Sequence, residues 1–313
     1  MVLSLVSMFF LLNVSAAPSI TNHTPQDNSI DSGKSVSQPS LHFFNSPQAG
    51  QGEYLSIYLK DIEPDDDVFL KTNLSNRADF YPSGNNRLLL LPISRSQKPG
   101  SYYLQIKAQR NGQTYYSVQK NIRVLTRKYP IQNMKVSSKT AAKRSSELWA
   151  LDKPHWEKGL SKSADHPLWT GTFIRPAVGR ISTQFGTLRT VNKSSTSRHS
   201  GIDIALAAGS PVRASQSGVV TLAMPLNISG NTVFVDHGCQ LFSIYYHLSK
   251  ITVKKGQIVK PGDLIGKVGS TGFSTGPHLH WSMELNHVYV DPALFVNPIT
   301  APVAVLDDTI ASK

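Results

Sequence analysis

The chain has 313 residues, of which 40% are hydrophobic and 17% are charged, a composition typical of a folded protein with room for two ordinary domains. Its single cysteine, Cys239, excludes an internal disulfide framework and a cysteine-rich zinc site. The formal net charge of +12 favours an anionic partner surface, although a basic solvated surface without a specific partner would carry the same charge. No basic motif interleaved with aromatic residues occurs, so no nucleic-acid partner is predicted.

An apolar run opens the chain and ends in the small residues Ser15, Ala16 and Ala17. It is shorter than the roughly 20 residues that a membrane-spanning helix needs. Residues 1–17 are therefore predicted to be a signal peptide, so that no stable membrane span remains after cleavage. No Lys or Arg precedes the apolar core, which leaves an uncleaved N-terminal anchor as the alternative. Both interpretations predict export.

Residues 18–40 are rich in Ser, Asn, Gln, Asp and Thr and are predicted to be a disordered lead-in. The sequence pattern changes over residues 41–126, where short runs of alternating polar and apolar residues are separated by turn signals. The pair Asn111-Gly112 between two such runs indicates a hairpin. Strands spaced about ten residues apart predict a small immunoglobulin-like β-sandwich.

Residues 127–165 differ again, because Ala141 to Lys158 combines helix-forming residues with many charges. This segment is predicted to be a basic linker with one or two short helices, interrupted at Pro154. No HExxH motif occurs here or elsewhere in the chain, which excludes a thermolysin-like zinc site on a helix.

Residues 166–298 consist almost entirely of short strand patterns and glycine turns, without an amphipathic helix of ten residues or more. They predict an antiparallel all-β domain. The tail, residues 299–313, has no strong pattern and is expected to be loosely ordered.

Histidines with even spacing stand out in this second domain. His278 and His280 are two residues apart, and His199 and Asp203 are four apart, so each pair would lie on one face of a strand. A catalytic Zn²⁺ ion needs three protein ligands and an open position, and His199, Asp203 and one or both of His278 and His280 can supply them. His247 is a third candidate histidine.

A peptidase also needs a base that takes a proton from the attacking water. Acidic residues are few in this domain, and Glu284, in phase with His280, is the weaker candidate beside a histidine. Tyr245 would share a face with His247 and either line a cleft or pack in the core. The glycine-rich segment 270–277 could be a cleft wall or a plain turn, and His237 is interpreted as structural.

Four motifs in order over residues 176–298 resemble the zinc metallopeptidases of family M23, the LytM and lysostaphin type, which cut peptide bonds in peptidoglycan. The motifs are RHSGIDIA, GNTVFVDHG, YYHLS and VKPGDLIGKVGSTGFSTGPHLHW. The resemblance implies one Zn²⁺ per chain, held by His199, Asp203 and His280. It makes His247 and His278 the catalytic histidines, which activate water and stabilise the tetrahedral intermediate. The N-terminal part is similar to the β-sandwich module that precedes this domain in some bacterial members.

The predicted function is that of an exported zinc endopeptidase of the periplasm or cell envelope, which hydrolyses cross-links or stem peptides of peptidoglycan. Peptidoglycan peptides are the expected partners, with anionic envelope polymers as further candidates. One alternative is a non-catalytic, wall-binding activator of amidases, since the family includes members that have lost ligands. All five site positions are present here, which favours an enzyme. A zinc amidase on a similar scaffold is the other alternative.

Overall fold

The computed structural model describes residues 38–44, 46–193, 195–298 and Pro302. The predicted signal peptide, most of the lead-in and all of the tail except Pro302 lie outside these residues. Within the described part of the chain, no helix is long and apolar enough to cross a membrane.

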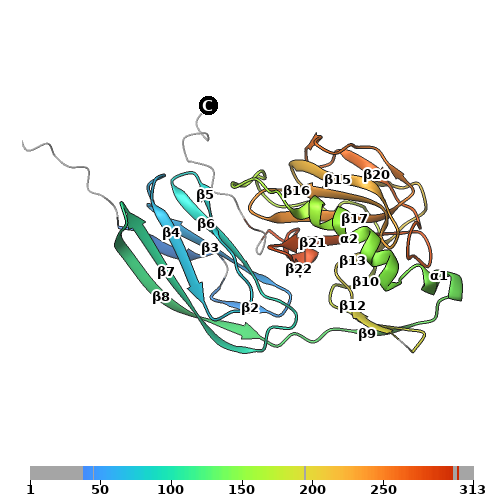
Figure 1. Cartoon of the computed structure of the whole chain (residues 1–313), viewed down its shortest axis with the longest axis horizontal. Coiled ribbons are helices and arrows are strands. Elements are labelled where there is room, and N and C mark those ends of the chain that lie inside the picture. Colours follow the sequence, from blue (N-terminus) through green and yellow to red (C-terminus); the bar gives the residue numbers. More distant parts are fainter. Residues whose placement is uncertain (1–37, 45, 194, 299–301, 303–313) are drawn as a thin grey trace, which may run out of the picture. The chain divides into compact units, whose positions relative to one another are not determined.

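The N-terminal part is built from two four-stranded sheets (Figure 1). One sheet has the order β1 (Ser40–Phe43), β3 (Tyr54–Lys60), β6 (Asn86–Pro92), β5 (Phe80–Ser83). The other has the order β2 (Gln48–Gly50), β8 (Gln113–Leu125), β7 (Gly100–Arg110), β4 (Asp67–Thr72). The predicted hairpin is confirmed, because β7 and β8 pair antiparallel and both turn residues, Asn111 and Gly112, have positive φ.

Apolar side chains from both sheets pack together in this part. Leu55, Ile57 and Leu89 from the first sheet pack in the same buried cluster as Leu104 and Ile122 from the second. The alternation seen in the sequence thus places one face of each sheet against the other. The immunoglobulin-like assignment stays a prediction.

The linker has more regular structure than the sequence indicates. It contains β9 (Ile131–Met134), α1 (Ser138–Ala142) and α2 (Ser146–Leu160). The expectation that Pro154 interrupts the helix is wrong, because α2 runs through it. A proline inside a helix costs about 3 kcal/mol. Tertiary contacts offset this cost, among them the Trp156 ring against Phe234, with ring centroids 4.6 Å apart.

Strand β9 joins a sheet of the second domain. It pairs in parallel with β11 (Leu188–Val191), which pairs antiparallel with β12 (Ser195–Arg198). The sequence did not predict this strand, since its pairing partner lies more than 50 residues away and Ile131 is exposed. The linker is therefore part of the second domain's structure over this stretch.

An eight-stranded sheet forms the centre of the second domain, and all of its pairings are antiparallel. Its order is β10 (Arg180–Thr183), β13 (Ile202–Ala205), β21 (His278–Leu285), β17 (Leu241–Leu248), β16 (Gly230–Asp236), β15 (Gly218–Leu226), β19 (Ile258–Val259), and β22 (Val288–Val290) pairs with β21. The predicted all-β class is confirmed. A smaller sheet contains β14 (Pro211–Arg213), β20 (Leu264–Lys267) and β18 (Lys250–Ile251), and a 3₁₀ turn η1 spans Pro292–Leu294.

Both faces of the large sheet are covered, which explains its nearly continuous apolar strands. Val233 and Val235 of β16 pack in a cluster with Val212 and Ile265 of the smaller sheet. Phe234, between them in sequence, packs instead in a cluster with Leu160 of α2. The large sheet therefore has one face toward the smaller sheet and one toward α2. The face toward α2 carries the candidate functional site.

Candidate metal and active site

Three side chains converge on the face of the large sheet that α2 covers. Asp203 of β13 and His280 of β21 lie directly opposite each other in the strand pairing, and His199 precedes β13. The distance between His199 Nε2 and His280 Nδ1 is 2.8 Å, and each of these atoms is 2.9 Å from Asp203 Oδ1. All three residues are buried. Of the two histidines in the HxH motif, the structure thus brings His280 to this group.

The outer atom of each side chain is held by a second contact. His199 Nδ1 donates to the carbonyl of Gln184 at 2.9 Å, and His280 Nε2 lies 2.8 Å from Ser282 Oγ. Arg189 forms an ion pair with Asp203 through Oδ2. Such outer contacts fix the tautomer of a histidine and the orientation of its ring. These contacts leave His199 Nε2, His280 Nδ1 and Asp203 Oδ1 as the atoms that face the centre of the group.

Charge at this group favours a cation. Burial, and then the neighbouring His199, lower the pKa of His280 to about 4, so its ring is neutral near pH 7. Burial alone would raise the pKa of the Asp203 carboxyl, but contacts with His199 and His280 outweigh it and hold that pKa well below its ordinary value. Two imidazole lone pairs and a carboxylate oxygen then face one another. This donor set fits a divalent metal ion, and it offers three protein ligands, as catalytic sites do.

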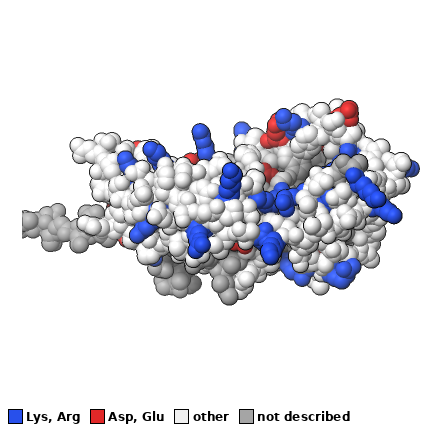
Figure 2. Space-filling model, turned by 90° about the horizontal axis from the view of Figure 1, so that it is seen from below, with Lys and Arg blue, Asp and Glu red and all other residues white. Residues whose placement is uncertain are grey.

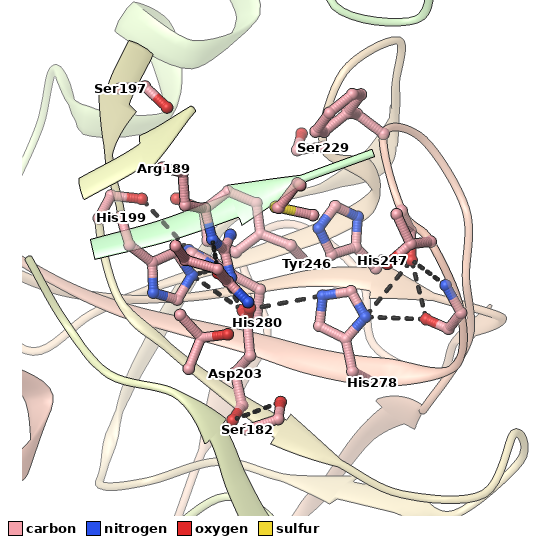
Figure 3. Close-up of a pocket in the computed structure, with 18 of the residues that line it drawn as sticks. Ser182, Arg189, Ser197, His199, Asp203, Ser229, Tyr246, His247, His278 and His280 are labelled. Carbon is pink, nitrogen blue, oxygen red and sulfur yellow. Dashed lines mark hydrogen bonds and ion pairs between the residues drawn. The ribbon is translucent and has the colours of Figure 1, made fainter. Parts of the chain in front are cut away.

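Two further histidines lie beside this group. Figure 3 shows His247 and His278 on one side of the cleft and His199, Asp203 and His280 on the other. His278 Nε2 is 3.7 Å from Asp203 Oδ1, and the His247 and His278 ring centroids are 4.9 Å apart. His278 Nδ1 donates to the Gly276 carbonyl and His247 Nδ1 to the Thr271 carbonyl, each at 2.8 Å. Both rings therefore keep Nε2 as the atom able to accept a proton.

The environment of His247 keeps its ring neutral. Burial lowers its pKa to about 3, with smaller contributions from His278 and His280. The backbone at His247 is left-handed, with φ of 60°. A residue without glycine's freedom adopts this conformation at an energetic cost, which is common at functional sites.

This backbone conformation breaks the strict alternation along β17. Tyr245 is wholly buried in the core, where its hydroxyl contacts Ser215 and Ser243. Tyr246 lines the cleft instead, with its ring centroid 4.4 Å from that of His280. Of the two interpretations of Tyr245, core packing is the correct one. The sequence does not single out Tyr246, because the signal for it is its register opposite His280, which only strand pairing reveals.

The cleft around these residues has a volume of about 480 Å³. The glycine-rich segment forms part of its wall through Phe273, Ser274, Thr275, Gly276 and Pro277, so it is more than a plain turn. Glu284 is not among the lining residues, because it lies four residues beyond His280, roughly 13 Å along the strand. His237 is also outside the cleft, buried against Ser217 and Ser243 as a structural residue.

Comparisons with known proteins agree with this arrangement. Residues 197–292 match the model of peptidase family M23. The chain is 40% identical over 129 residues to the DD-carboxypeptidase/endopeptidase Mpg of Neisseria meningitidis, covering 41% of this chain and 30% of that protein. It is 47% identical over 85 residues to the peptidoglycan DD-endopeptidase ShyA of Vibrio cholerae, covering 27% of this chain and 20% of that protein. The chain thus matches less than a third of the length of these relatives.

A solved structure extends the similarity beyond the matched segment. A crystal structure from Pseudomonas aeruginosa, named as an M23 peptidase, aligns with a TM-score of 0.58 at 26% identity. The alignment covers 82% of this chain and 96% of that one, so it includes most of the described residues outside the family match. Sequence, fold and the His-Asp-His group agree, and the chain therefore contains a domain of peptidase family M23.

Proposed function

We propose that the protein is a zinc-dependent endopeptidase that hydrolyses peptide bonds of peptidoglycan. The observation that carries the proposal is the convergence of His199, Asp203 and His280 within an M23 domain. The printed names of relatives, such as the peptidoglycan DD-endopeptidase ShyA, support the substrate class. For the bond itself we propose the cross-link between D-Ala and meso-diaminopimelate, with a glycine bridge as the rival.

In this proposal His199 Nε2, Asp203 Oδ1 and His280 Nδ1 hold one zinc ion. When bound, zinc polarises the carbonyl of the scissile peptide bond and lowers the pKa of water to about 7. Asp203 is ionised and contributes the single negative charge of the ligand set. Arg189 holds the other oxygen of this carboxylate, so that Oδ1 stays aimed at the site.

The two remaining histidines handle protons. Each donates its Nδ1 hydrogen to a backbone carbonyl, which fixes the tautomer and leaves Nε2 to accept a proton from water. His278 is the nearer of the two to the ligand group and is the proposed base. His247 is neutral at rest, so only a proton taken up at Nε2 during turnover would make that atom a donor toward the developing oxyanion. The same carbonyl contacts stabilise either ring once it is protonated.

Export to the periplasm or cell envelope is part of the proposal. It is supported by the apolar run and small residues within positions 1–17 of the sequence and by the substrate of the relatives. The net charge of +12 would aid contact with an anionic envelope.

Digestion of purified peptidoglycan with and without a chelator tests this function, when the fragments are identified by mass. An endopeptidase converts cross-linked dimers to monomers and stops when metal is removed. Release of whole stem peptides from the sugar would indicate an amidase instead. Full biological effect of the metal-free protein would indicate an amidase activator, an alternative that the retained histidines disfavour.

A further inference from the structure

The cleft has an excess of positive charge. Its lining residues include three arginines, Arg144, Arg189 and Arg198, but a single acidic residue, Asp203, so positive charge exceeds negative charge before any metal is counted. On the face of the molecule shown in Figure 2, Lys and Arg side chains are also more widespread than acidic ones. The cleft is therefore suited to a substrate with negative charge.

The three arginines differ in what they contact, and Arg198 lies over the Tyr129 ring, 5.7 Å from its centroid. Arg189 contacts Asp203 and donates from Nε to Gln132 at 2.9 Å, so its charge is matched inside the protein. Arg144 has no acidic partner among the described residues and instead lies over the Phe273 ring, 5.5 Å from its centroid. Partial burial, and then the positive charge of Arg189, lower the pKa of Arg144 from its ordinary value, and it still remains a cation near pH 7. Arg144 is thus an unmatched cation at the cleft.

The position of Arg144 is set by the fold. It lies between α1 and α2, and α2 is tied to the cleft by the buried carboxylate of Asp152. That carboxylate accepts hydrogen bonds from the backbone nitrogens of Asn227 and Ile228, both at 2.8 Å. The Ile228 carbonyl in turn accepts from the backbone nitrogen of Phe273 at 2.7 Å. Helix α2 and the backbone of Phe273, whose ring lies under Arg144, are therefore both hydrogen-bonded to the loop at residues 227 and 228.

We propose that Arg144 binds a free carboxylate of the substrate peptide next to the scissile bond and thereby selects acidic over amidated peptides. The inference rests on the proposed function for the identity of the peptide. A guanidinium presents a planar fork of donors that matches a carboxylate, whereas a neutral carboxamide forms fewer and weaker contacts. Stem peptides with free carboxyl groups on their acidic and diamino-acid residues have this chemistry. The Phe273 ring would hold the guanidinium in place between turnovers.

The test compares two synthetic cross-linked dimers that differ only in whether these carboxyl groups are free or amidated. Wild-type protein loaded with zinc is expected to cleave the free acid with about tenfold higher kcat/KM than the amidated dimer, mainly through a lower KM. A tenfold difference corresponds to the loss of one charge-assisted contact. In Arg144→Ala this preference should disappear, and Arg144→Lys should restore part of it. Lys143→Ala is the matched control, since Lys143 is an adjacent exposed cation that does not line the cleft, and it should keep the preference.

Binding of the same two peptides to zinc-loaded His278→Ala protein, with and without Arg144→Ala, provides a readout that does not depend on cleavage. Tighter binding of the free acid that is lost on removing Arg144 supports the inference, even if no bond is cut. Equal handling of both peptides by the wild-type protein, or an unchanged preference in Arg144→Ala, would overturn the inference and leave the peptidase function intact. If the wild-type protein cleaves neither peptide but the free acid is still bound more tightly through Arg144, that result would count against the peptidase function alone.

Discussion

Asp203 and His280 face each other across two neighbouring strands, with Oδ1 and Nδ1 2.9 Å apart. The strand register alone brings these two donors together, although 76 residues separate them in sequence. A slip of one residue between β13 and β21 would turn one of the side chains to the opposite face. The apolar residues that alternate with them, such as Ile204 and Leu279, are fully buried and fix this register.

Replacing a ligand should separate metal binding from proton transfer. We expect His280→Ala to abolish zinc binding, because two donors remain where three are needed. Zinc content of the purified protein, measured by atomic absorption, checks this result. Stoichiometric zinc in the variant would contradict the role given to His280.

His278→Ala should behave differently, because His278 lies beside the ligand group and outside it. We expect one zinc ion per chain to be retained and turnover to fall by roughly 10²–10⁴-fold, the usual contribution of a general base. Zinc content and kcat are measured on the same preparation. Near-normal kcat would remove His278 from the mechanism, and loss of zinc would make it a ligand.

Arg189 orients Asp203 and does not itself reach the centre of the ligand group. In Arg189→Ala the carboxylate loses its outer partner, and zinc affinity should fall by about 10–100-fold, as for other outer contacts of metal ligands. Competition with a chromogenic chelator measures the affinity. Arg213→Ala, which removes an exposed arginine outside the cleft, is the control and should have wild-type affinity.

The contacts of Asp152 should matter for stability. Its buried carboxylate accepts three hydrogen bonds, two from backbone nitrogens and one from the Asn227 side chain. Asp152→Ala leaves these donors unpaired, and we expect the free energy of unfolding to fall by roughly 2–4 kcal/mol. Urea denaturation measures the loss. Glu157→Ala on the exposed side of the same helix should change the free energy of unfolding by less than about 0.5 kcal/mol.

Acid should destabilise the fold through His237. Burial lowers the pKa of this fully buried ring to about 4, below its ordinary value of 6.5. Above pH 6.5 the His237 ring is neutral in both the folded and the unfolded chain, so it does not make the free energy of unfolding depend on pH there. Below pH 6.5 the unfolded chain takes up a proton that the folded protein does not, and stability falls by about 3 kcal/mol until pH 4.

Urea denaturation of chelator-treated protein at pH 7.5 and pH 4.5 measures this effect, with His237→Gln as the comparison. The variant should lose less stability than the wild-type protein between the two pH values, because glutamine does not titrate. Equal losses would show that His237 does not contribute to the pH dependence.

The sequence by itself determined the two-residue spacing of His278 and His280, the four-residue spacing of His199 and Asp203, and the strand patterns that carry them. The period of a β-strand places His278 and His280 on one face of β21. The same expectation is wrong for His199 and Asp203, because His199 lies between β12 and β13 and only Asp203 is on a strand. The all-β class, the Asn111-Gly112 hairpin and the resemblance to family M23 were accessible because they too rest on local patterns.

Only the tertiary structure decided which atoms meet. The pairing of β13, β21 and β17 selects His280 for the triad of donors and places Tyr246 rather than Tyr245 at the cleft. Pairing of β9 with β11 and packing of α2 against the large sheet bring linker residues, Arg144 among them, to the cleft wall. These outcomes depend on contacts between segments far apart in the chain, whose free energy no local pattern of residues encodes.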